Sequence, residues 1–309
     1  MKENYILKKV LRAIIYKIIR KPKTSIRLIP NTIIAKFLRP VVRVFYKHKL
    51  RRVSAIEKEI VDCLYEEGVK SVHGSTLEID EFEGVMAECQ KLLDGLKEDH
   101  LVTENGSSTV KNSCLMNHQK IILFGLSEKL LGVVQNYFQV PFLYRGVGFR
   151  IERDSGSVAT RLWHKDREDE NTVKIILYFN DVNELSGSFS YIPKQYTRVI
   201  DRSTTSYRVS DEEIEKIVPQ SEIKIPIGPS GQMVFADTCQ VFHKGLDPIE
   251  KPYRIALFFT YITKIPNDLR VNSSYFPVSS LDINFEDLTD LQKSSLSHKW
   301  TDGNDWVRG

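Results

Sequence analysis

The spacing of hydrophobic residues divides the chain into a helical first part and a strand-rich second part. In the first part of the body, apolar positions recur every three or four residues, which predicts helices over 55–69, 79–96 and 127–138. Beyond residue 143 the period changes, and short apolar segments are separated by turn-forming residues. These segments predict strands over 144–151, 172–180, 187–192, 222–227, 232–236 and 254–262.

The segment 172–180 shows the strand pattern most clearly, because apolar residues alternate along it as they do in a half-buried strand. The predicted strands follow one another without intervening helices, and the chain has no G-x-G-x-x-G motif. Both features argue against a parallel nucleotide-binding sheet. We therefore expect a mainly β fold with flanking helices (α+β), in the form of a sandwich, a jelly roll or a barrel.

The composition is that of a globular protein and excludes a fibre, a collagen or a fully disordered chain. Of 309 residues, 41% are hydrophobic and 27% are charged. The four cysteines lie 25 or more residues apart and form no C-x-x-C pair, so we interpret them as free thiols in a reducing compartment. Since the sequence also shows no secretory signal pattern, we expect a cytoplasmic protein.

Charge is distributed unevenly and marks off the first 52 residues as a basic arm. Residues 1–52 contain 16 Lys or Arg and a single acid, Glu3, whereas the other 257 residues carry 28 basic and 39 acidic side chains. Two amphipathic helical blocks are predicted in this arm, one over 6–20 that ends before Pro22 and one over 33–47 with a kink at Pro40.

Three interpretations fit this arm. It lies on an anionic membrane surface at the inner face, it packs against the acidic body, or it is a mitochondrial targeting segment. Neither block has about 18 uninterrupted apolar residues, so a membrane-spanning helix is not expected. Nucleic acid is not an expected partner, because the basic residues alternate with aliphatic rather than aromatic side chains.

Three potential metal ligands lie in the strand-rich part of the chain. His164 and Asp166 stand at positions i and i+2 and therefore on the same side of an extended segment, and His243 follows 77 residues after Asp166. Two neutral imidazoles and one carboxylate suit one face of an Fe(II) octahedron and leave the opposite face open for cosubstrate and O2. The motif H-x-D alone is common, so its meaning depends on the residues around it.

Arg254 is one residue that helps to interpret the H-x-D motif. It opens the predicted strand 254–262 and shares a face with Ala256, Phe258 and Thr260. A guanidinium at the floor of an apolar pocket binds a carboxylate in bidentate fashion, and 2-oxoglutarate needs a cation for its distal carboxylate. The alternative for Arg254 is a surface ion pair, and the nearest acid in the sequence is Glu250.

Four motifs in this order resemble the phytanoyl-CoA dioxygenase family over about residues 144–262. They are Trp163-His164-Lys165-Asp166, the segments 177–183 and 186–193, and Gly231–Asp237 leading to His243 and Arg254. The resemblance implies a double-stranded β-helix (a cupin-like jelly roll) that holds non-haem Fe(II) and uses 2-oxoglutarate and O2. By this resemblance His164, Asp166 and His243 are the iron ligands and Arg254 binds the cosubstrate.

The resemblance further implies a dioxygenase domain over residues 53–309. Its reaction releases succinate and CO2 and hydroxylates a C–H bond, because a carboxylate ligand at Asp166 favours hydroxylation over halogenation. The prime substrate is a small molecule or a lipid-linked molecule. Tyr178 and Arg150, on the strands after and before the H-x-D motif, are candidates for lining the cosubstrate and substrate sites; the alternative is that Tyr178 lies in the core and Arg150 pairs with an acid. The alternative is a non-catalytic cupin-like scaffold that binds a membrane surface or a partner through its basic arm. The sequence predicts no oligomeric state.

Overall fold

The computed structural model describes residues 31–104, 106–153, 161–204, 206–267, 271–297 and 299. The first predicted amphipathic block, over 6–20, lies outside these residues. No helix in the described ranges has both the length and the apolar character needed to cross a lipid bilayer.

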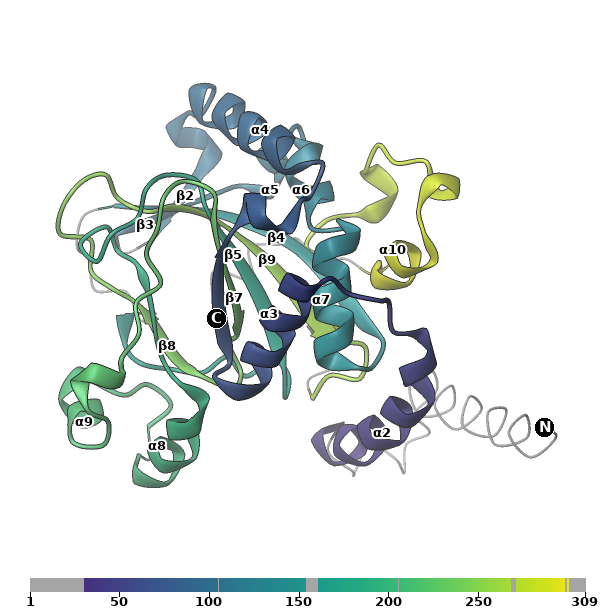
Figure 1. Cartoon of the computed structure of the whole chain (residues 1–309). Coiled ribbons are helices and arrows are strands. Elements are labelled where there is room, and N and C mark those ends of the chain that lie inside the picture. Colours follow the sequence, from purple (N-terminus) through teal and green to yellow (C-terminus); the bar gives the residue numbers. More distant parts are fainter. Residues whose placement is uncertain are drawn as a thin grey trace, which may run out of the picture.

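A large antiparallel sheet forms the centre of the molecule (Figure 1). Its seven strands are ordered β1-β7-β5-β9-β4-β3-β2. Strands far apart in the sequence are therefore neighbours, as expected for a jelly roll. The strands are β1 (Val69–His73), β2 (Leu101–Glu104), β3 (Ser107–Val110), β4 (Phe142–Glu152), β5 (Thr172–Tyr178), β7 (Gln232–Asp237) and β9 (Ile255–Thr263).

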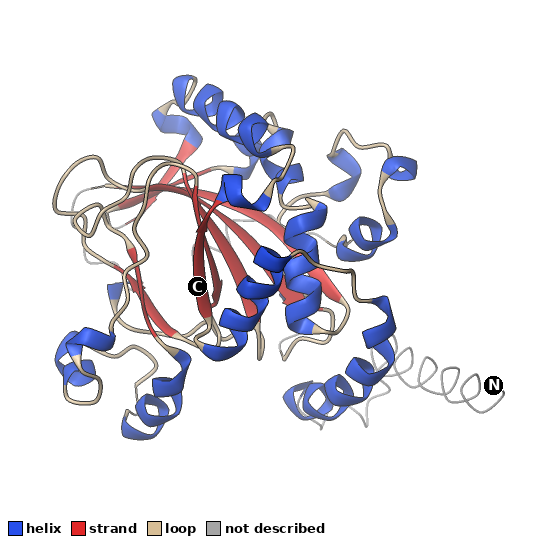
Figure 2. Ribbon diagram, viewed as in Figure 1, coloured by secondary structure: helices blue, strands red, loops and turns tan. Residues whose placement is uncertain are grey.

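A smaller sheet lies opposite the large one and consists of β6 (Phe189–Ile192) and β8 (Phe242–Gly245) (Figure 2). Single bridges extend it, from Trp163 to Val209 and from Tyr191 to Lys224. The predicted strand over 222–227 is wrong in this region, because only Lys224 is paired and a 3-10 turn covers Gln220–Glu222. Pro226 lacks the N–H that a longer ladder would need.

The alternation along β5 divides its side chains between two environments. Val173, Ile175 and Leu177 belong to the main hydrophobic core, which also contains the helices, whereas Ile176 and Tyr178 belong to a second cluster on the other face of the sheet. Helices α3 (Ala55–Glu66) and α7 (Glu128–Phe138) pack on each other over the large sheet (Figure 1). The other face of the large sheet, which carries Ile176 and Tyr178, is left free to line a pocket.

The helices match the predicted ones in place but differ at their ends. The long helices are α2 (Asn31–Tyr46), α3 (Ala55–Glu66), α4 (Phe82–Asp94) and α7 (Glu128–Phe138), and the short ones are α5 (Asn112–Leu115), α6 (Gln119–Phe124), α8 (Thr197–Ser203), α9 (Asp211–Glu215) and α10 (Asp290–Ser295). The predicted helix 55–69 ends early because Gly68 adopts φ +86°, in the left-handed region, and β1 begins directly after it. A Cβ at Gly68 would also lie 2.4 Å from Val241, so no other residue fits there.

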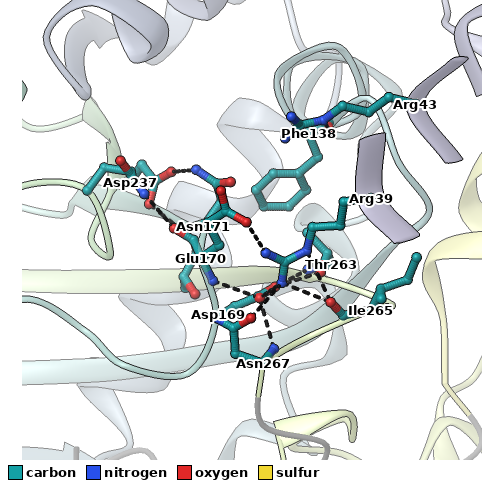
Figure 3. A network of polar contacts seen from close by, with 12 residues as sticks. Arg39, Arg43, Phe138, Asp169, Glu170, Asn171, Asp237, Thr263, Ile265 and Asn267 are labelled. Carbon is teal, nitrogen blue, oxygen red and sulfur yellow. Dashed lines mark hydrogen bonds and ion pairs between the residues drawn. The ribbon is translucent and has the colours of Figure 1, made fainter. Parts of the chain in front are cut away.

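Helix α2 is attached to the body through a buried arginine (Figure 3). The Arg39 guanidinium contacts the carboxylates of Asp169 and Glu170 and donates to the Ile265 carbonyl over 2.8 Å. The Asp169 carboxylate also accepts a 2.6 Å hydrogen bond from the Thr263 hydroxyl. Asp169 follows Asp166 by three residues, so this network anchors the chain just beyond the H-x-D segment.

A second buried carboxylate, Asp237 at the end of β7, joins three elements. It accepts hydrogen bonds from the Tyr137 hydroxyl of α7 over 2.7 Å and from the Asn171 amide over 2.6 Å. The backbone N–H of Thr172, at the start of β5, donates to it over 3.1 Å. Burial raises the pKa of Asp237 to about 6, although these hydrogen bonds oppose the rise.

This raised pKa predicts a measurable pH dependence of stability. The folded state binds the Asp237 proton more tightly than the unfolded state, so the contribution of Asp237 to the free energy of unfolding falls as pH rises from about 4 to about 6. At about 1.4 kcal/mol per pKa unit, the loss is about 3 kcal/mol. In Asp237→Asn this fall is absent, and urea denaturation at several pH values measures the difference. Parallel curves for the two proteins would contradict the assignment.

Candidate metal centre

The two candidate histidine ligands are placed side by side by backbone pairing. The N–H of His164 donates to the carbonyl of His243 over 3.1 Å, and the N–H of His243 donates back over 2.9 Å. The N–H of Asp166 donates to the Thr238 carbonyl over 2.9 Å, at the turn after β7. As a result, one ligand atom from each of His164, Asp166 and His243 lies within 4.8 Å of the others.

Hydrogen bonds to the backbone fix which ring nitrogen of each histidine faces the centre. Nδ1 of His164 lies 2.8 Å from the Leu162 carbonyl, and Nδ1 of His243 lies 3.2 Å from the Val241 carbonyl. A carbonyl only accepts, so each Nδ1 carries the proton and each Nε2 is an unprotonated donor atom for a metal.

Burial keeps both imidazoles neutral. It lowers the pKa of His164 and lowers the pKa of His243 to about 3, with the neighbouring His164 adding to the second shift. Neutral imidazole is the form that binds metal ions. At neutral pH no proton has to leave either ring before a metal ion is bound.

The carboxylate of Asp166 is buried and paired with a lysine on β5. The Lys174 ammonium lies 2.6 Å from Oδ2 of Asp166. Burial by itself raises the pKa of Asp166, but the charge of Lys174, the two neighbouring histidines and the hydrogen bond from Lys174 together outweigh it and hold the pKa below its usual range. In return Asp166 raises the pKa of Lys174 against the opposing effect of burial. Asp166 is therefore an anion and Lys174 a cation.

These three residues fit a divalent iron ion. Two neutral imidazole nitrogens and one carboxylate form the facial donor set of non-haem Fe(II) oxygenases. The three side chains are buried, and within the described part of the chain they are the one cluster of three or more histidine, cysteine or acidic residues with ligand atoms this close. A pocket opens beside them, between the two sheets.

Charged residues line much of this pocket. Besides the three candidate ligands, it is lined by Arg150, Glu152, Arg161, Glu168, Lys174, Lys244 and Arg254. Apolar residues from β5, β6 and β9, namely Ile176, Phe189 and Phe258, complete much of its wall. Basic groups outnumber acidic ones, so the pocket suits a negatively charged molecule.

Arg254 lies in this pocket but is not at the surface, where an ordinary ion pair would form. It is buried, and its guanidinium lies 2.8 Å from Oε1 of Glu152. Glu152 is the last residue of β4, next to β9 in the sheet, so the acid that pairs with Arg254 is 102 residues away in the sequence. Arg161 lies 3.8 Å from the other oxygen of Glu152 and also pairs with Asp247.

The two remaining candidate site residues, Arg150 and Tyr178, lie in different parts of the structure. Arg150 lines the pocket, with its guanidinium 5.9 Å from the centre of the Phe258 ring. Tyr178 is fully buried in the second hydrophobic cluster, and its hydroxyl donates to the Pro226 carbonyl over 3.0 Å. Burial raises the pKa of Tyr178, and Arg254 opposes that rise, which places the two side chains near each other.

Sequence reasoning missed the roles of Glu152, Arg161 and Tyr275 in this pocket. The sequence contained one usable signal for Glu152. This residue directly follows the predicted strand 144–151 and stands two positions after Arg150, one of the inward positions of that strand. Arg161 precedes the H-x-D motif in an irregular segment, and Tyr275 comes from the C-terminal region that shows no periodicity. No local pattern identifies these two.

A jelly roll that gathers two histidines and a carboxylate beside a pocket has the architecture of the non-haem iron enzymes. By sequence, no protein-family model and no curated protein matches this chain. The resemblance to the phytanoyl-CoA dioxygenase family therefore has no support from these searches.

Solved structures do match the fold. The epimerase SnoN, in complex with Fe3+, alpha ketoglutarate and nogalamycin RO, matches with a TM-score of 0.51 at 12% identity, over 81% of this chain and 97% of that chain. HygX from Streptomyces hygroscopicus, with nickel, 2-oxoglutarate and hygromycin B bound, matches with a TM-score of 0.50 at 13% identity, over 73% of this chain and 94% of that chain. At these identities the comparisons establish a shared fold, and they confirm the predicted fold class.

Proposed function

We propose that this chain is an Fe(II)- and 2-oxoglutarate-dependent dioxygenase that hydroxylates a C–H bond of a small-molecule or lipid-linked substrate. The observation that carries the proposal is the convergence of His164, Asp166 and His243 at one point, in the same pocket as Arg254. When bound, the iron would couple oxidative decarboxylation of 2-oxoglutarate by O2, with release of succinate and CO2, to oxidation of the substrate.

In this proposal the protein's own residues hold and orient the reactants. His164, Asp166 and His243 bind the iron, and Arg254 binds the distal carboxylate of 2-oxoglutarate, with Tyr178 beside it. To free the Arg254 guanidinium, the Glu152 carboxylate has to give up at least part of its ion pair with it. The Arg161 guanidinium lies 3.8 Å from Glu152 and is near enough to pair with that carboxylate instead. The buried walls of the pocket exclude water from the reacting groups.

Arg150 is the proposed contact to the prime substrate, since it lines the pocket on a strand next to β9. A substrate with a carboxylate, phosphate or other hydrogen-bond acceptor suits it. The proposed catalytic domain covers residues 53–309 and the proposed arm residues 1–52. All four cysteines are free, which supports a reducing compartment such as the cytoplasm.

An anaerobic titration with Fe(II) and then 2-oxoglutarate tests the proposal. We expect a visible metal-to-ligand charge-transfer band only when both are present, and we expect His164→Ala to abolish it because the remaining ligands bind iron weakly. His118→Ala is the matched control, since His118 pairs with Glu88 away from the pocket. A wild-type protein that is folded by circular dichroism and gives no band would favour the non-catalytic scaffold instead.

A further inference from the structure

Helix α2 turns a hydrophobic stripe toward solvent. Phe37 is 73% exposed, Val41 39% and Val44 67%. Their spacing of four and three residues places them on one face of the helix. Large apolar side chains that are exposed one at a time are ordinary, but a row of three along one helix marks a surface that contacts something apolar.

The opposite face of α2 is fixed against the body, so the stripe cannot turn inward. Ala35 is buried and Arg39 is 2% exposed. Arg39 reaches the carboxylates of Asp169 and Glu170 (Figure 3). Arg39 thus faces the protein together with Ala35 and the partly buried Val42, while three larger apolar residues face out.

The charges around the stripe indicate what covers it. Residues 31–52 contain seven Lys or Arg and no Asp or Glu. Lys36 stands before the stripe and Lys47 after it, and both are exposed. A surface that combines exposed apolar residues with cations is complementary to an apolar layer bordered by anions.

Two occupants from the chain itself are disfavoured by charge. A second copy docked through the same face would bring its own exposed lysines, Lys36, Lys47 and Lys49, against those of the first. Residues 1–30 are no better, because they carry nine Lys or Arg and only Glu3 as an acid. In both cases like charges would meet around the stripe and repel each other.

We propose that α2 is a membrane-docking surface, which inserts Phe37, Val41 and Val44 at the interface of an anionic lipid bilayer. Lys36 and Lys47, on either side of the stripe, then lie at the level of the lipid headgroups. This proposal is independent of the iron chemistry. It also places the network of Arg39 and Asp169, three residues from Asp166, directly behind the docked helix.

Co-sedimentation of the full chain with vesicles tests the proposal. We expect binding to vesicles of phosphatidylcholine mixed with phosphatidylglycerol, weaker binding to phosphatidylcholine alone, and a decrease at high salt. In the double variant Phe37→Ser/Val44→Ser, the partition coefficient should fall about tenfold or more, because two apolar side chains no longer leave water. Ile249→Ser is the matched control, since Ile249 is 67% exposed, as Val44 is, but lies outside α2.

A second measurement separates α2 from the rest of the basic arm. In Phe37→Trp, brominated phospholipids should quench the added tryptophan on binding, whereas in Ile249→Trp they should not. Unchanged binding of the double variant together with unquenched Phe37→Trp would overturn the proposal and assign membrane contact to other residues. Failure of the full chain to bind anionic vesicles would overturn it as well.

Discussion

Replacement of Arg254 by alanine is expected to raise the dissociation constant of 2-oxoglutarate at least about 30-fold. Removing one partner of a buried charge pair costs about 2 kcal/mol or more, which corresponds to that factor. Iron binding should persist, because Arg254 is not among the three ligands that converge. Titration of the charge-transfer band with 2-oxoglutarate, at saturating Fe(II) and without O2, measures the change.

Two further variants distinguish cosubstrate binding from simple disruption. Arg254→Ala leaves the Glu152 carboxylate buried without its partner, whereas Glu152→Gln/Arg254→Met removes both charges and should weaken 2-oxoglutarate binding to a similar degree. Glu152→Gln alone should strengthen binding, because it removes the carboxylate that competes for Arg254. Loss of iron binding in Arg254→Ala would refute the role that we assign to this residue.

The second large effect is expected at the ion pair that attaches α2 to the body. In Arg39→Ala the free energy of unfolding should fall by about 3 to 5 kcal/mol, because the buried Asp169 loses its cation. Urea denaturation of the full chain measures this loss. Arg52→Ala is the control, since Arg52 is exposed and its removal should change stability by at most about 0.5 kcal/mol.

A double-mutant cycle attributes the loss to the ion pair. If Arg39 and Asp169 stabilise the fold through each other, Arg39→Ala should cost much less in the background of Asp169→Asn than in the wild-type protein. Additive losses would instead mean that Arg39 acts through its hydrogen bond to Ile265 and its contacts with the body.

The features that local patterns determine were predictable from the sequence. The alternation along β5 specifies which side chains face the helices and which face the pocket, because successive side chains of a strand point to opposite sides. The spacing of His164 and Asp166 likewise follows from an extended backbone. The fold class followed from the change of period near residue 143.

Pairings between distant segments were not predictable. Glu152 meets Arg254 because β4 and β9 are neighbours, with Ile151 opposite Ile255, and nothing near either residue specifies that register. For the same reason β1 was not predicted as a strand; it gains its ladder from β7, more than 150 residues later.

The orientation of α2 could not be deduced from its amphipathic pattern alone. The pattern predicts an apolar face and a basic face but not which of them meets the body. In the structure Arg39 pairs with the buried Asp169 and Val42 packs on the main core, which leaves Phe37, Val41 and Val44 exposed. Pairing of the buried Asp169 thus takes precedence over burial of these three apolar side chains.

The ion pair between Lys174 and Asp166 bears on how the protein matures. The carboxylate of Asp166 is matched by a buried ammonium and the two histidines are neutral, so these four residues bring no uncompensated charge into the interior. Domains that depend on a metal ion to assemble their ligands stay unfolded without it. In this protein the Lys174 ammonium supplies the counter-charge for Asp166, so the chain can fold before it binds a metal ion. With iron as the metal, as we propose, a cell short of iron would then accumulate folded protein ready to be activated, rather than unfolded chains destined for proteolysis.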